Sequence, residues 1–137
     1  MQPVPYLFFN GNCADALNFY QSTLGAELEF QIKAGDMPGM DVPEESSDQI
    51  AHATLKIGDG QIMMSDSIFE PAPAMAGSSV MKSFATVAEA QPVFEALSDG
   101  AAIEMPFAPT FWSAGFGTLT DKFGVKWMIG SDEMPES

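Results

Sequence analysis

Residues 6–20 read YLFFNGNCADALNFY and predict a short strand followed at once by a helix. The first four residues are apolar and aromatic, which is typical of a strand, and Asn10-Gly11-Asn12 interrupts them. Asn12 is a good N-cap, and Asp15 places a negative charge in the first helical turn, where the helix dipole favours it. Apolar residues then recur at helical spacing until Gly25, a residue suited to ending a helix.

Three further strands complete a first unit. The segment Glu27–Ile32 alternates apolar and polar residues, and Ile50–Ile57 and Gln61–Ser65 form a hairpin across Gly58-Asp59-Gly60. Between them, Ala34–Gln49 has no periodicity, contains Gly and Pro, and is predicted as a long exposed loop. The predicted order is therefore strand, helix and three strands (βαβββ).

The same order returns in the second half of the chain. We predict a strand at Val80–Phe84, a helix at Val87–Leu97, a strand at Ile103–Met105 and a hairpin of Gly115–Thr120 with Val125–Gly130. Short matches between the halves keep one order: Ala14–Leu17 with Ala88–Gln91, then Thr54, Gly60 and Met64 with Thr118, Gly124 and Met128. We infer an internal repeat.

These patterns predict an α+β fold in which two βαβββ modules form a curled, mostly antiparallel sheet. The 137 residues are expected to make a single domain, with module one at about 4–66, a linker at 67–79 and module two at about 80–131. Each module leaves one sheet face without a helix, and in water such a face needs packing, a second subunit or a ligand. Residues lining these faces are the first candidates for function.

The charge of the chain excludes some classes of partner. Nineteen acidic and five basic residues give a formal charge of -14, so we expect no nucleic-acid and no membrane partner. The sequence has no long apolar run and no export signal, and Cys13 is its one cysteine, so a cytoplasmic location is expected. The charge favours solubility or, as a sharper interpretation, attraction for cationic small molecules.

Three stretches carry a more specific signal: Pro5–Tyr20, Leu24–Glu27 and Phe111–Trp127. They resemble the PhnB-like branch of the vicinal-oxygen-chelate superfamily, which includes glyoxalase I, extradiol dioxygenases, fosfomycin-resistance enzymes and bleomycin-binding proteins. The resemblance implies paired βαβββ modules, a homodimer with pockets built from both chains, and a small-molecule ligand. PhnB-like sequences often carry a demethylubiquinone methyltransferase label, but we find no glycine-rich strand–turn–helix to hold S-adenosylmethionine.

The resemblance also implies a divalent metal, held in enzymes of the superfamily by His and Glu, sometimes Gln or Tyr, on the first and last strands of each module. Carried onto this sequence, those positions fall near Pro5, Met64, Ser79 and Met128. Zn, Ni, Mn and Fe prefer oxygen and nitrogen ligands, whereas methionine is soft and serine is a poor ligand. We therefore expect no metal ligands at these positions and no metal cofactor.

His52 is the one histidine of the chain and the candidate catalytic residue, because a general base needs a group that titrates near neutrality. It alternates with Thr54 and Lys56 on the more polar face of its strand, where it is a candidate base or polar anchor; a structural role is the alternative. Cys13 lies near a helix start, which can activate a thiol, but we interpret it as a small apolar residue.

The candidate ligand-binding residues are aromatic and methionine side chains, because rings stack on ligands and methionine forms adaptable apolar surfaces. Packing in the core is the alternative for each. They are Phe8, Met64, Phe111, Trp112, Phe116 and Met128.

We therefore predict a PhnB-like protein that binds a small organic molecule without the usual metal, and leave open whether it catalyses a reaction. One alternative is a metal-dependent enzyme of the glyoxalase or dioxygenase type, with metal ligands outside the aligned positions. Another is sequestration of a cationic, bleomycin-like antibiotic, which the charge of -14 favours.

Overall fold

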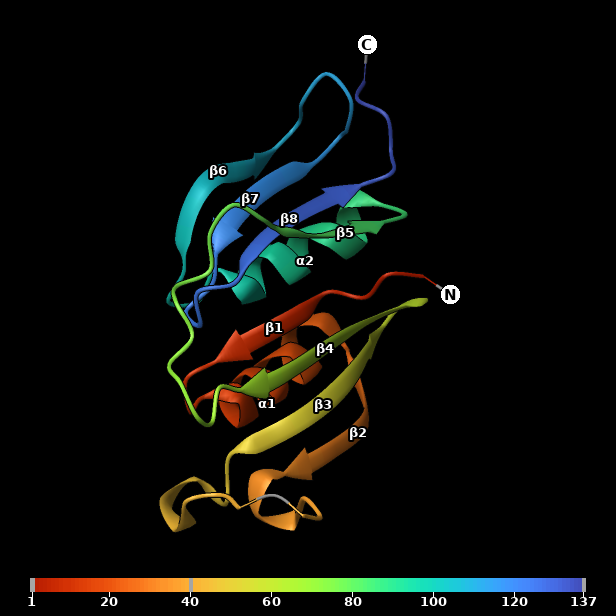
Figure 1. Ribbon diagram of the computed structural model, residues 1–137. Helices are drawn as coiled ribbons and strands as arrows, with labels where there is room; N and C mark the ends of the chain where they lie inside the picture. Colours follow the sequence, from red (N-terminus) through yellow and green to blue (C-terminus); the bar gives the residue numbers. More distant parts are fainter. Residues whose placement is uncertain (1, 40, 137) are drawn as a thin grey trace. The chain divides into compact units, whose positions relative to one another are not determined.

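The computed structural model describes residues 2–39 and 41–136 and shows two compact units, Met1–Pro73 and Ala74–Ser137. Each unit contains one α-helix and one four-stranded sheet, in the order strand, helix and three strands (Figure 1). The predicted α+β class and the repeated βαβββ order are therefore confirmed.

In the first unit the strand order is β1-β4-β3-β2, with β1 parallel to β4 and the other pairs antiparallel. Helix α1 covers one face of this sheet (Figure 1). No α-helix among the described residues of this unit covers the opposite face, which we call the open face of the first sheet. The elements are β1 (Tyr6–Phe9), α1 (Cys13–Leu24), β2 (Glu27–Lys33), β3 (Ile50–Ile57) and β4 (Gly60–Asp66).

The second unit repeats this topology. Its strand order is β5-β8-β7-β6, again with one parallel pair, β5 with β8, and helix α2 lies against the sheet. The face away from α2 is the open face of the second sheet. The elements are β5 (Val80–Phe84), α2 (Val87–Leu97), β6 (Ala102–Ala108), β7 (Phe116–Thr120) and β8 (Lys126–Ser131).

Alternation along the strands decides which side chains meet the helices. In the first sheet Leu55 pairs with Ile62 and Ala53 with Met64, and all four are buried. Directly paired residues point to the same face of a sheet, so these side chains form the layer under α1. The helix contributes Cys13, Ala16, Leu17 and Tyr20 to the same core.

In the second sheet, Leu119, Trp127 and Ile129 form the corresponding buried layer against α2. Gly117 lies in the middle of this layer. A Cβ atom there would come within 2.7 Å of the Phe94 ring of α2, so the absence of a side chain lets the helix approach the sheet.

The carboxylate of Asp66 joins three parts of the first unit. Its Oδ1 accepts hydrogen bonds from the backbone N–H groups of Gly11 (2.8 Å) and Cys13 (3.0 Å), and its Oδ2 accepts one from Ile50 (2.9 Å). The first N–H groups of a helix have no partner within the helix, so the end of β4 supplies the acceptor for the start of α1. Asn12 occupies the predicted N-cap position, but its side chain makes no capping hydrogen bond.

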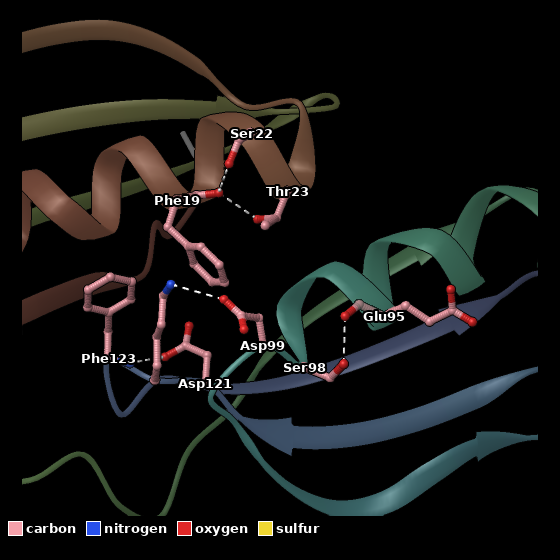
Figure 2. A network of polar contacts seen from close by, with 9 residues as sticks. Phe19, Ser22, Thr23, Glu95, Ser98, Asp99, Asp121 and Phe123 are labelled. Carbon is pink, nitrogen blue, oxygen red and sulfur yellow. Dashed lines mark hydrogen bonds and ion pairs between the residues drawn. The ribbon is translucent and has the colours of Figure 1, made fainter.

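Asp121 organises the turn between β7 and β8. Its Oδ1 accepts from the backbone N–H groups of Phe123 and Val125, and its Oδ2 accepts from the indole N–H of Trp127 at 2.9 Å. Figure 2 shows this turn, with Asp99 at the end of α2, whose carboxylate forms an ion pair of 3.4 Å with Lys122. The largest side chain of the second core is thus fixed by a buried carboxylate.

One predicted loop is more ordered than expected, and one predicted strand is too short. The segment between β2 and β3 contains two short 3-10 helices, Ala34–Asp36 and Glu44–Ser46, and the backbone of Ala34 donates to the carbonyl of Gln49, so it is only partly an exposed loop. Strand β6 extends beyond Met105 to Ala108: its register against β7 shifts around Pro106, which lacks an N–H, and pairing resumes with Ala108 opposite Phe116. Neither α1 nor α2 nor any other described helix has the length and hydropathy that crossing a membrane requires.

We predict that Asp66→Ala lowers the free energy of unfolding by about 2–4 kcal/mol, because three backbone N–H groups, two of them in buried hydrogen bonds, lose their acceptor. Chemical denaturation followed by circular dichroism measures the change. Asp48→Ala is the matched control: its carboxylate is 94% exposed in a long ion pair with Lys33, so an effect under about 0.5 kcal/mol is expected. Equal effects of the two substitutions would contradict the role of Asp66.

Candidate functional site

One row of paired residues crosses the open face of the first sheet. Tyr6 of β1 pairs with Met63 of β4, Met63 with Thr54 of β3, and Thr54 with Phe30 of β2. Direct partners share a face, so these four side chains lie on the face away from α1. We call them the first row.

His52 lies beside the first row, two residues before Thr54 on β3. Its Nδ1 is 3.0 Å from the hydroxyl oxygen of Tyr6, and its Nε2 is 3.3 Å from that of Thr54. A neutral imidazole has one donor and one acceptor nitrogen, and a hydroxyl can play either part, so both bonds form in either tautomer. The ring is therefore held in one orientation by a Tyr6–His52–Thr54 chain.

Aromatic rings surround this chain. The Tyr6 ring lies 5.0 Å from Phe8 and 5.6 Å from His52, and Phe30 lies 6.0 Å from His52 on the other side, between ring centroids. Phe8 and Phe30 are each about half exposed, at 52% and 50%. Surfaces that bind small molecules typically combine aromatic side chains with a few polar groups held in place, as here.

The chain of hydroxyls and imidazole can perform two kinds of chemistry. It can hydrogen-bond a polar group of a ligand through the Tyr6 hydroxyl, and it can move a proton between that hydroxyl and His52. His52, predicted as a base or polar anchor, is thus placed where either role is available, with Tyr6 as the more exposed partner.

The second sheet carries the corresponding row with different chemistry. Met81 pairs with Met128, Met128 with Thr118, and Thr118 with Met105, so three methionines and one threonine cross its open face. The position that matches His52, two residues before the threonine on the third strand, is Phe116. The repeated unit therefore has an apolar ring where the first has its imidazole.

Phe111, Trp112 and Phe116 lie together in the second unit. Trp112 is 5.3 Å from Phe116 and 4.8 Å from Phe111, both edge-on, and Phe111 is 88% exposed. The Thr110 side chain accepts from the N–H groups of Trp112 and Ser113, which fixes the loop that presents them. Phe116 itself is buried beneath this loop.

The prediction that Met64 lines an open face is wrong. Met64 is fully buried under α1, and its neighbour Met63 holds the position that corresponds to Met128. Thr54 and its partner Met63 are nine residues apart, whereas Thr118 and its partner Met128 are ten apart, because the β7–β8 turn has one more residue. A shift of one residue moves a side chain to the opposite face of the sheet.

Three of the residues predicted from the sequence lie on an open face: Phe8 and His52 in the first sheet and Met128 in the second. The sequence analysis did not identify Tyr6, Phe30, Thr54 and Met63 as site residues. A signal for two of them was present. Tyr6 precedes Phe8 by two residues on β1, and Thr54 follows His52 by two on β3, so strand alternation alone gives each pair one face. The cross-strand neighbours Phe30 and Met63 depend on the register of pairing.

Comparison with known proteins identifies the family. The model of the Glyoxalase/Bleomycin resistance protein/Dioxygenase superfamily matches residues 3–129. The chain belongs to this superfamily. It is 42% identical to protein YjdN of Escherichia coli K12 over 137 aligned positions, which cover 91% of each chain.

Two solved structures support the same assignment. Protein PA1353 of Pseudomonas aeruginosa has a TM-score of 0.88 and 41% identity, covering 97% of this chain and 98% of its own. The PhnB protein of Bacillus cereus, described as a putative 3-demethylubiquinone-9 3-methyltransferase, has a TM-score of 0.79 and 27% identity, covering 96% of this chain and 99% of its own. The PhnB-like resemblance predicted from the sequence is confirmed.

The superfamily's usual divalent metal does not fit the residues found here. On the open faces, the outermost strand and its neighbour offer Tyr6 with Met63 in the first sheet and Met81 with Met128 in the second. One phenol with three soft thioethers does not complete a site for Zn, Ni, Mn or Fe, which prefer several oxygen and nitrogen ligands. Across residues 2–39 and 41–136, no three His, Cys, Asp or Glu side chains gather as a metal site would require.

Cys13 is inert by its surroundings. The side chain is fully buried at the start of α1, and burial, with a smaller contribution from the charge of Asp66, raises the pKa of its thiol from 9.0 to about 12. A helix start lowers a thiol pKa only where the thiolate is solvated, so desolvation decides the outcome here.

We expect iodoacetamide at about pH 8 to modify Cys13 at least a hundredfold more slowly in the folded protein than in denaturant, since the thiolate fraction falls about a thousandfold. Mass spectrometry measures the rates. Ser22→Cys in a Cys13→Ala background places an exposed thiol on the same helix and should react rapidly.

Because the Cys13 thiol ionises at lower pH in the unfolded chain than in the folded protein, it also lowers the free energy of unfolding as the pH rises from about 9 to about 12, an effect that Cys13→Ala removes.

Proposed function

We propose that this protein is a PhnB-like small-molecule-binding protein whose ligand surface is the open face of the first sheet. The observation that supports the proposal is the Tyr6–His52–Thr54 chain, set among exposed aromatic rings. Holding these side chains in one arrangement costs conformational entropy, and exposing aromatic rings to water is unfavourable. A bound ligand that covers the rings would offset both costs.

The expected ligand is a small organic molecule with an apolar body and at least one polar group. The apolar body would stack on Phe8, Tyr6 and Phe30, and the polar group would hydrogen-bond the Tyr6 hydroxyl. Binding proceeds without the superfamily's usual divalent metal, because the strand positions offer thioethers and a phenol. The homodimer and the cytoplasmic location expected from the sequence stay predictions.

His52 gives an unusually clean test, because it is the one histidine in the sequence and its ring protons form one set of NMR signals. We expect a panel of neutral and charged aromatic and aliphatic metabolites to contain compounds that shift these signals saturably. Tyr6→Phe should weaken binding of such compounds about tenfold, since one hydrogen bond to the ligand is lost.

The control for this experiment is Phe69→Leu, which changes an exposed ring outside the sheet of the same unit and should leave the affinity unchanged. His52→Gln, followed by thermal shift with the same compounds, should reduce the stabilisation that they give. If compounds bind but Tyr6→Phe and His52→Gln leave their affinity intact, the ligand surface lies elsewhere. Stoichiometric Ni, Zn, Mn or Fe in the purified protein, lost in His52→Gln, would instead favour a metal-dependent enzyme.

A further inference from the structure

Four rings form a continuous strip across the open face of the first sheet, in the order Phe8, Tyr6, His52 and Phe30. Successive ring centroids are 5.0, 5.6 and 6.0 Å apart, with interplanar angles of 37°, 34° and 45°. The rings are tilted rather than stacked flat, and Phe8, Tyr6 and Phe30 each keep at least a third of their surface exposed. The strip therefore leaves parts of several aromatic rings exposed on one face of the sheet.

The charges of the first unit are mainly negative. The first unit contains eleven acidic residues against two lysines. Glu29 lies in the β2 bulge next to Phe30 and accepts a hydrogen bond of 2.7 Å from Gln61, and Glu27 lies further along the same edge strand. Lys56, on the same face as His52, has Glu27 and Gln61 as its direct strand partners, so a carboxylate stands opposite its charge.

We infer that the ligand of the open face carries an organic ammonium group, which the aromatic strip binds by its ring faces. This inference rests on the proposed function and specifies its ligand class. The face of an aromatic ring is the negative end of its quadrupole, so it attracts a cation, and a methylated ammonium loses little hydration when rings cover it. A simple apolar surface would not distinguish such a cation from a neutral molecule of the same shape.

The long-range field favours the same ligand class. A formal charge of -14 raises the local concentration of cations and lowers that of anions at low ionic strength. An anionic ligand would gain from the two lysines of the unit, Lys33 and Lys56, but would meet the carboxylates of Glu27 and Glu29 on the same edge strand. The two effects, ring quadrupole and net charge, are separable because only the second is screened by salt.

The test uses three molecules that share one branched head: choline, its neutral isostere 3,3-dimethylbutan-1-ol, and the anion 3,3-dimethylbutanoate. Each is titrated into the whole protein while the ring signals of His52 are followed by NMR. We expect choline to bind about tenfold more tightly than the neutral alcohol, and the anion to bind most weakly. Raising the salt concentration from about 10 to about 200 mM should narrow the choline advantage without removing it.

Phe30→Leu and Phe8→Leu should reduce the preference for choline over the alcohol to less than about threefold, because they replace ring faces by aliphatic side chains. Phe69→Leu is the matched control and should keep the full preference, since Phe69 is an exposed ring outside the strip. Circular dichroism of each variant checks that the fold is retained.

The two proposals fail in different ways. If the alcohol or the anion shifts the His52 signals as strongly as choline, the ligand surface stands and the cationic class is overturned. If none of the three shifts these signals, the cationic class is likewise overturned, and the wider metabolite panel decides on the ligand surface by itself. A choline preference that survives Phe30→Leu and Phe8→Leu together would show that charge alone, and not the aromatic strip, selects the ligand.

Discussion

The Asp66 carboxylate sits where three chain segments meet: the end of β4, the start of α1 and the start of β3. Its three hydrogen bonds hold Gly11 and Cys13 on one side and Ile50 on the other. Because Asp66 ends β4 and Ile50 begins β3, the tie favours one register of these strands. That register places Met63 and Thr54 on the open face and Met64 beneath α1. A slip of β4 by one residue would move Met64 to the open face and Met63 beneath the helix. The candidate site thus depends on a carboxylate that does not belong to it.

The two units show how one topology supports two different surfaces. Both sheets have a threonine at the same place in the third strand and a methionine opposite it. Around this shared pair the first unit has Tyr6, Phe30 and His52, whereas the second has Met81, Met105 and Phe116. The buried layers under the helices are similar in kind, so the difference lies almost entirely on the open faces. Polar chemistry is concentrated in the first unit, and the second offers soft apolar contacts.

The fold could be predicted from the sequence because local signals and the repeat agree. Apolar alternation marks the strands, Gly25 ends α1 in the left-handed conformation with φ 66°, and the order of elements recurs. The site could be predicted only in part. His52 stands out as the one histidine, but its hydroxyl partner Tyr6 is 46 residues away and meets it through the parallel pairing of β1 with β4.

The wrong prediction for Met64 comes from the same alignment of the two halves that correctly predicted the repeat. Thr54, Gly60 and Met64 align with Thr118, Gly124 and Met128 at one offset, but the β7–β8 turn holds one more residue than the β3–β4 turn, so the strand pairing matches Met63 with Met128. The Asp121 side chain stabilises this longer turn by accepting from two of its own backbone N–H groups. Sequence spacing does not show how many residues a turn contains, and one residue more or less in the turn puts each side chain of the following strand on the opposite face of the sheet.

The fixed position of Trp127 has a spectroscopic consequence. Both tryptophans of the chain, Trp112 and Trp127, belong to the second unit, and both tyrosines, Tyr6 and Tyr20, belong to the first. Trp127 is buried with its indole N–H on Asp121, so its emission changes when that core opens to water. Intrinsic fluorescence therefore distinguishes the halves of the duplication without any label, and it can reveal whether they melt cooperatively or one after the other.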